Sequence, residues 1–125
     1  MILALALLLQ AAPAPEPAWQ GLGVHQGIET AYDPASLHSE GGRVRVRTRG
    51  VAPAAGPDGI RIVTGTIEID CAAGTVTALD ARGYDANGRL MLNAINPPAE
   101  RQPEPIRPDS PNAAVRARVC AGAGQ

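Results

Sequence analysis

The residues of this sequence that could do chemistry are few, and its two cysteines come first. Cys71 ends the alternating stretch TIEIDC, and Cys120 ends VRARVC close to the last residue. A zinc site needs about four ligands, usually Cys or His at short spacing, and a catalytic cysteine needs a neighbour that lowers its thiol pKa. Neither pattern occurs around these cysteines. The remaining interpretation, which the even count supports, is a structural disulfide in an exported protein.

The other candidate catalytic and metal-binding groups lack a convergent pattern. Ser36 and His38 place a hydroxyl near an imidazole, but a serine nucleophile also needs an oriented third group and oxyanion donors. The G-x-S-x-G turn that would expose such a serine is absent. Asp33, Asp70 and Asp85 each lie beside a turn or strand end, where aspartates commonly cap the backbone, and no calcium-binding loop surrounds them. We therefore predict no catalytic residue, no metal and no cofactor.

Four arginines are the remaining candidates for binding. The stretch GRVRVRTR alternates strictly, so its valines share one face of a predicted strand and its arginines the other. This arginine row consists of Arg43, Arg45, Arg47 and Arg49. Guanidinium groups suit carboxylates and phosphates, so the row is a candidate contact face for an anionic or glycan partner. The interpretation we favour is a solvated face paired with acidic neighbours such as Glu68 or Asp70.

Length and composition limit the classes of function. The chain has 125 residues, enough for one domain, and a formal net charge of −1. No global charge attracts it to nucleic acid or to an anionic membrane, and no basic face interleaved with aromatic residues is present. Aromatic residues are scarce, so the core is built from Val, Ile, Leu and Ala. A small core of this kind benefits from a covalent cross-link.

The N-terminal stretch predicts export. ILALALLL is an uninterrupted apolar run, and the small, proline-rich QAAPAPEPA follows it, as in the cleavage region of a signal peptide. The run is far shorter than the roughly 20 apolar residues of a membrane-spanning helix. We therefore predict a leader over residues 1–18 with an open cleavage site, followed by a single domain over 19–125. No stable membrane insertion of the mature chain is expected.

Alternation and turn signals place these candidates on strands. Strands are predicted over residues 19–25, 28–33, 42–49, 60–71, 74–85 and 89–93. Gln26-Gly27 and a two-residue hairpin at Asn87-Gly88 join neighbouring strands, and the stretch AYDPASL predicts a turn at Pro34.

The strand over 60–71 is expected to be amphipathic. Val63, Ile67, Ile69 and Cys71 would share its apolar face, and Thr64, Thr66, Glu68 and Asp70 its polar face. Cys71 would therefore point to the side on which a helix packs.

The C-terminal stretch predicts one helix after a proline-dense segment, residues 97–111, in which we expect no regular structure. Ser110 is placed as N-cap and Pro111 as first helical residue, and the helix would end near Cys120. Its small face, formed by Ala113, Ala114, Ala117 and Cys120, is expected against the sheet, which leaves Val115 and Val119 on the far side. A disulfide from Cys71 to Cys120 would then tie helix to sheet.

The order of these motifs is similar to that of a known family. The chain carries a tryptophan at the domain start, Y-D-P-x-S-L, a glycine before an alternating valine strand, I-x-I-D-C, Y-D-x-x-G and a terminal V-C. They are Trp19, residues 32–37, 42–46, 67–71 and 84–88, and Val119-Cys120. In this order and spacing they resemble the surface-adhesin protein E-like family of bacterial envelope proteins, over nearly the whole predicted mature chain.

The resemblance implies a mainly β, α+β fold: an antiparallel sheet of about six strands with a C-terminal helix disulfide-tied to one face. It implies a location in the periplasm or on the outer surface of a Gram-negative bacterium. The family's namesake is associated with binding host matrix proteins, and a homodimer is left open. We therefore expect an exported, non-enzymatic binding module whose partner is a protein or a glycan. The alternative is a periplasmic small-ligand-binding protein with its site between sheet and helix.

Overall fold

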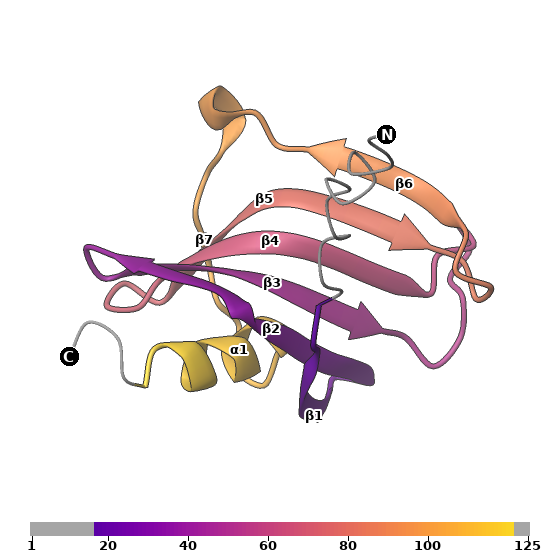
Figure 1. Cartoon of the computed structure of the whole chain (residues 1–125), viewed down its shortest axis with the longest axis horizontal. Helices are drawn as coiled ribbons and strands as arrows, with labels where there is room; N and C mark the ends of the chain where they lie inside the picture. Colours follow the sequence, from indigo (N-terminus) through magenta and orange to yellow (C-terminus); the bar gives the residue numbers. More distant parts are fainter. Residues whose placement is uncertain (1–16, 122–125) are drawn as a thin grey trace, which may run out of the picture.

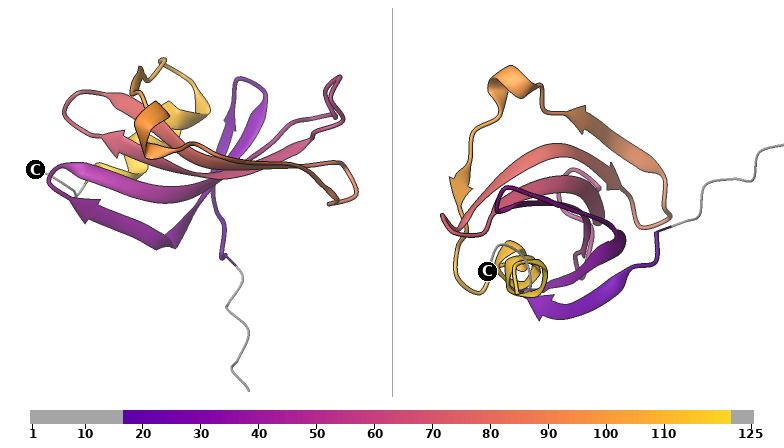
Figure 2. Two further views of the ribbon diagram at one scale, coloured as in Figure 1. Left: turned by 90° about the horizontal axis from the view of Figure 1, so that it is seen from above. Right: turned by 60° about the vertical axis from the view of Figure 1, so that its left-hand side comes forward.

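The computed structural model describes residues 17–121, which form one strongly curved antiparallel sheet with an α-helix in its concavity (Figures 1 and 2). Consecutive strands are neighbours from β1 to β6, and the two-residue β7 pairs with the start of β5. The bounds are β1 Gln20–His25, β2 Ile28–Glu40, β3 Arg43–Val51, β4 Ile62–Asp70, β5 Thr75–Tyr84, β6 Leu90–Ile95, β7 Glu104–Pro105 and α1 Pro111–Val119. The predicted fold class is confirmed. The predicted leader lies outside the described residues apart from Pro17 and Ala18.

Two hairpin turns follow from local residue chemistry. Gln26 and Gly27 both have positive φ, as the two central residues of a type I′ turn require, so the turn between β1 and β2 is confirmed. The turn between β5 and β6 differs from the two-residue prediction. Asp85 and Arg89 still pair through their backbone, and Gly88 takes the positive φ that closes a three-residue loop.

The turn predicted at Pro34 is wrong, because β2 runs through it. The register between β2 and β3 shifts between Asp33 and His38, so the proline lies in a bulge. Ser36 replaces the lost ladder contacts: its Oγ donates to the Asp33 carbonyl at 2.7 Å and accepts from the Arg47 N–H at 2.8 Å. A bulge tolerates a proline that a regular ladder would not.

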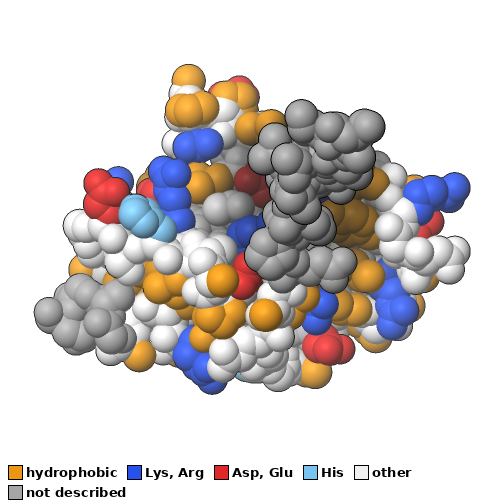
Figure 3. Space-filling view, in the orientation of Figure 1, with side chains coloured by type: hydrophobic (Ala, Val, Ile, Leu, Met, Phe, Trp, Pro, Cys, Tyr) orange, Lys and Arg blue, Asp and Glu red, His pale blue; other side chains and the backbone are white. Residues whose placement is uncertain are grey.

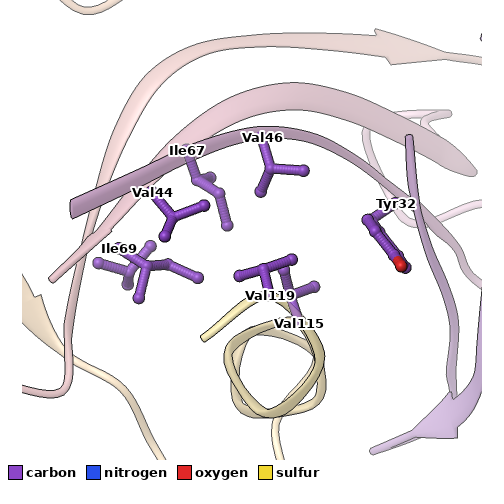
Figure 4. Packing of buried hydrophobic residues seen from close by; sticks show 8 residues of the cluster. Tyr32, Val44, Val46, Ile67, Ile69, Val115 and Val119 are labelled. Atoms are coloured by element: carbon purple, nitrogen blue, oxygen red, sulfur yellow. The ribbon is translucent and has the colours of Figure 1, made fainter. Parts of the chain in front are cut away.

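The core lies between the concave face of the sheet and α1 (Figure 4). Val44 and Val46 of β3 and Ile67 and Ile69 of β4 point from the sheet toward the helix, as the alternation predicted. Tyr32 of β2 closes one side of the cluster. Burying these β-branched side chains is the main apolar contribution to folding.

The helix begins as predicted but packs through a different face. Ser110 Oγ accepts from the Ala113 N–H at 3.1 Å, which confirms the N-cap. Val115 and Val119, only 1% and 5% exposed, point into the sheet, whereas Ala117 is exposed. The predicted small-residue face is therefore wrong.

The position of the disulfide explains the rotation of the helix. Cys120 is bonded to Cys71 just after β4, on one flank of the helix. This leaves the valines, one helical turn apart, to face β2 and β3.

The amphipathic pattern of β4 holds for only part of the strand. Ile67 and Ile69 are buried as predicted, but Val63 on the same face is 44% exposed and Thr64 on the opposite face is buried. The helix does not cover the end of the sheet where Val63 lies. Thr64 is flanked in register by the long side chains of Arg49 and Arg82.

The proline-dense segment contains more order than expected. A 3-10 helix spans Pro98–Glu100, and β7 pairs with Thr75 and Val76. The segment runs around the edge of the sheet, lining a hollow with Arg101 and Pro103 on the convex side and reaching α1 on the concave side (Figure 1). Within residues 17–121, no helix has the length and apolar character needed to cross a bilayer.

Candidate functional site

The arginine row lies on the convex face of the sheet, opposite the buried valines of β3. Antiparallel pairing with β4 sets Arg43 against Asp70, Arg45 against Glu68, Arg47 against Thr66 and Arg49 against Thr64. Cross-strand neighbours of this kind are close enough for their side chains to interact. The sequence pattern therefore predicted the face and the neighbours correctly.

Glu68 pairs with the first two arginines of the row. Its carboxylate lies 2.8 Å from Arg45 Nε and 4.0 Å from Arg43 Nη1. Both guanidinium groups are more than half exposed, so the pairs contribute about 0.2–1 kcal/mol each at most. The expected pairing with Glu68 is confirmed. Asp70 instead accepts from the Ala73 N–H at 3.0 Å and caps the turn after β4.

The other end of the row has a different environment. The Arg49 guanidinium lies over the Trp19 ring at 5.2 Å from the centroid, a cation–π contact. Its Nε is buried without a hydrogen-bond acceptor among the described residues. Arg47, between the two ends, forms no ion pair with a carboxylate of residues 17–121.

The exposed end of the row is hollowed. Two adjoining depressions of about 540 and 240 Å³ share Arg43, Arg45 and Glu68. His38 and Glu40 border one of them, and Asp70, Thr75, Thr77 and Arg101 border the other. In the space-filling view, basic side chains adjoin acidic and histidine side chains on one side of the molecule (Figure 3). We call these two depressions the convex groove.

Arg101 is a member of the convex groove that the sequence did not indicate. It belongs to the proline-dense segment, far from the arginine row along the chain, and its Nε donates to the Asn96 carbonyl at 2.9 Å. Only the path of that segment around the sheet edge brings it to the row. The sequence shows that this residue is basic, but it does not show that the residue lies beside the arginine row.

The structure does not bring Ser36 and His38 together as a nucleophile and base. Ser36 Oγ is occupied by the β2 bulge, as the expectation of a local hydrogen bond required. His38 is exposed and its Nε2 lies 3.4 Å from Glu40.

The three aspartates act as backbone caps. Asp33 accepts from the Ala35 N–H at 3.0 Å, and Asp85 accepts from those of Asn87 and Arg89 at 2.9 and 2.8 Å. The hydrogen bond from the Arg89 N–H, with smaller contributions from Asn87 and the Arg89 charge, lowers the pKa of Asp85 below its ordinary value of 3.8. Asp70 and Asp85 thus stabilise turns and Asp33 stabilises the β2 bulge, and the capping role predicted for the three aspartates is confirmed.

The predicted disulfide is present. It ties the end of α1 to the turn after β4, next to Asp70 at the border of the convex groove. Cys71 and Cys120 are bonded, with their Cα atoms 5.8 Å apart. Arg116 Nη2 donates to the Cys71 carbonyl at 2.7 Å, and the Ile106 N–H donates to Gly74 at 3.0 Å. The Arg116 guanidinium lies so close to Gly74 that a Cβ there would be 3.2 Å from Nη1. Three contacts therefore hold α1 and its approach to the turn between β4 and β5.

A hollow of about 590 Å³ lies beside the disulfide, and we call it the disulfide hollow. Both cysteines line it, with Ala72, Ala113, Ala117 and Ala121, the chain from Ile106 to Pro108, and Arg116. The predicted small-residue face of the helix thus borders this hollow. The space between helix and sheet, where the sequence left room for a ligand, holds Val115 and Val119, and a hollow of about 310 Å³ remains between Ile67, Val76 and Ala78 of the sheet and Asn112 of α1.

Comparison with known proteins agrees with this fold. The model of the family described as Surface-adhesin protein E matches residues 19–121. A structure of Haemophilus influenzae protein E superimposes with a TM-score of 0.57 at 18% identity, covering 92% of this chain and 93% of that one. A structure of protein E from non-typeable H. influenzae gives 0.52 at 16% identity, covering 90% and 82%. Among curated proteins, none matches significantly.

Proposed function

We propose, since the chain belongs to the surface-adhesin protein E family, that it is an exported, non-enzymatic module that binds a protein or glycan partner. Its contact face in this proposal is the convex groove with the rest of the arginine row. The disulfide-tied helix acts as the support that holds the sheet in its curved shape. No catalytic residue, metal or cofactor is part of the proposal.

The observation that supports this face is the exposure of its guanidinium groups. Arg43 and Arg45 share one carboxylate, so Glu68 neutralises one of the two charges. Arg47 adds a charge without an ion-pair partner among the described residues. Guanidinium groups that are exposed and only partly neutralised can exchange a weak surface ion pair for a bidentate contact with a partner's carboxylate or sulfate.

A binding assay with paired variants tests the proposal. The probes are a panel of immobilised extracellular-matrix glycoproteins and a heparin resin. We expect the variant Arg43→Gln/Arg45→Gln to bind the retained probe at least tenfold more weakly, while its thermal unfolding stays near that of the wild type. Arg89→Gln is the matched control, because Arg89 is exposed and pairs with Asp85 in a turn outside the groove. Equal binding by both variants would contradict the proposed face.

Export is part of the same proposal. We propose that residues 1–18 are a leader removed on export and that residues 19–125 are the mature domain, located in the periplasm or on the outer surface. Intact mass of the protein from the native envelope fraction tests this. A shortened chain is the expected result, and a full-length chain in the cytosol would contradict it.

We also propose that two copies of the chain pair through β6. This edge strand pairs only with β5 among the described strands, and all six of its residues are exposed. Ile95 is 75% exposed and Leu92 46%, which is unusual for an unprotected sheet edge. Pairing with a second β6 would satisfy its free backbone groups and cover these side chains.

Sedimentation of the purified protein at 1–100 μM, on the order of typical weak-dimer constants, tests the pairing. We expect a dimer that Leu92→Lys converts to a monomer. Val24→Lys is the control, because Val24 is an exposed apolar residue on β1 at the opposite edge. A wild-type monomer across the whole range would overturn the proposal.

A further inference from the structure

We infer that the disulfide hollow is a thiol-exchange site that favours anionic thiols. This inference concerns a different surface from the convex groove and does not depend on the partner proposed for it. It rests on the access to the disulfide, on the charges around it and on the contacts that hold the helix when the bond is opened.

Access comes from the position of the bond at the edge of the core. Cys71 and Cys120 both line the disulfide hollow, which is open to solvent, and neither residue is fully buried. Half of the other lining residues are alanines, and Ile106 and Pro108 are also among them. Small side chains leave room for a thiol to approach a sulfur, whereas a structural disulfide inside a packed core is shielded from attack.

The charged side chains that line the hollow within residues 17–121 are all basic. They are Arg107 and Arg116, and no carboxylate of a described residue lines the hollow. Asp70, the neighbour of Cys71, lines the convex groove on the other face and caps the Ala73 N–H. Asp109 follows the wall of the hollow without lining it. An anionic thiol is therefore attracted to the hollow, and a cationic one is repelled.

The contact between Arg116 and Cys71 is the basis on which the leaving sulfur is assigned. Arg116 donates to the Cys71 carbonyl at 2.7 Å, so its guanidinium lies beside this cysteine. A nearby cation stabilises a thiolate, and a stabilised thiolate is the better leaving group. The incoming thiolate attacks Cys120 Sγ and forms a mixed disulfide there. The Cys71–Cys120 bond breaks, Cys71 leaves as a thiolate, and solvent protonates it, with no net change in redox state.

The helix has contacts that remain after this step. Val115 and Val119 stay buried against β3, Arg116 still holds the Cys71 carbonyl, and the Arg118 guanidinium lies 5.9 Å from the Tyr32 ring centroid. The adduct can therefore form on the folded protein. Exchange is expected to be first-order in thiol rather than limited by the rate of global unfolding.

Exchange kinetics with three small thiols test the inference. The oxidised protein is treated with 2-mercaptoethanesulfonate, 2-mercaptoethanol or cysteamine, and each rate is divided by the rate of the same thiol on a small neutral disulfide. We expect the normalised rate of the anionic thiol to exceed that of the cationic thiol roughly tenfold at low salt, and the ratio to approach one in 1 M NaCl. Arg107→Gln should lower the ratio about threefold without loss of fold, whereas Arg89→Gln should leave it unchanged.

Three results would overturn the inference. One is a wild-type ratio near one at low salt, because the arginines would then not select the thiol. Another is a rate that does not depend on thiol concentration, because the disulfide would then open only on unfolding. The last is an adduct found by peptide mapping on Cys71 rather than on Cys120, which would reverse the assignment of the leaving sulfur.

Discussion

The concave face of the sheet has two halves that share strands but differ in what covers them. In the covered half, Val44, Val46, Ile67 and Ile69 lie beneath α1 and are buried. In the open half, no helix of residues 17–121 covers the strands, and two of the four residues aligned across them are glycines. The view along the helix shows how the curved sheet wraps around it (Figure 2).

The open half is built around glycines. Gly50, Val63, Gly83 and Leu92 lie side by side in register across β3 to β6. Ile28 packs over Gly50, where a Cβ would be 3.0 Å from its Cγ2, and Ile60 packs over Gly83 in the same way. Val63 and Leu92 stay exposed.

The difference shows how one sheet forms the core in one half and leaves apolar residues exposed in the other. Where neighbouring strands present β-branched side chains, a separate element must cover them, and the disulfide holds that element in place. Where they present glycines, single nearby isoleucines lie against the backbone, and a shallow hollow of about 370 Å³ remains beside Ile28, Ile60 and Val63. The covered half therefore carries most of the stability, and the open half leaves apolar edge residues available for pairing.

Among the changes that test this comparison, removal of the disulfide should lower the free energy of unfolding the most. The bond closes a loop with a sequence separation of 49 residues, so Cys71→Ser/Cys120→Ser should lower the free energy of unfolding by about 4 kcal/mol in the chain-entropy estimate. Urea unfolding of the oxidised, reduced and double-variant proteins measures it. A loss below about 1 kcal/mol would mean that packing alone holds the helix.

Truncation of one side chain in each half should give the next largest effect. Ile69→Ala removes a fully buried side chain of β4 and should cost about 3 kcal/mol, because it leaves a cavity against α1. Val63→Ala, on the same face of the same strand, should cost less than about 0.5 kcal/mol because Val63 is 44% exposed. Equal losses would show that the open half is covered in solution.

A glycine between the two halves provides a sharper test of close backbone approach. The register shift between β4 and β5 brings the Asp80 carbonyl to Gly65, where a Cβ would be only 2.5 Å from the oxygen. Gly65→Ala should therefore destabilise the protein by about 2 kcal/mol. Gly21→Ala is the control, because nothing lies within 4 Å of a Cβ there, and thermal unfolding of both variants measures the difference.

The smallest effect on stability should come from lowering the pH, which protonates Asp85 in the turn between β5 and β6. The folded-state pKa of Asp85 lies below the ordinary value of 3.8, so its stabilisation is present above about pH 4 and is lost as pH falls through the lowered pKa. The Arg89 amide resonance should report this loss in an NMR titration. In Asp85→Asn, the shift at Arg89 should vanish, while amides in the covered half stay unchanged.

Much of the fold could be predicted from local pattern. Strict alternation over β3 predicted which side chains face the core, and Ser110 with Pro111 predicted the start of α1, because strand pleating and helix capping act within a few residues. The even cysteine count in a chain with an export-like leader predicted the disulfide. The arginine row and its pairing with Glu68 followed from the same alternation.

The tertiary structure decided what local pattern left open. The helix presents Val115 and Val119 because the bond to Cys71 orients it. Arg101 joins the arginine row because a proline-dense segment runs around the sheet edge, and β2 passes through Pro34 because Ser36 supplies the missing contacts. The first two depend on residues far apart in the sequence, and the third depends on pairing between neighbouring strands, so local periodicity predicts none of them. By itself the sequence determined strand faces, caps and the cross-link, and long-range packing decided which surfaces became core, groove and hollow.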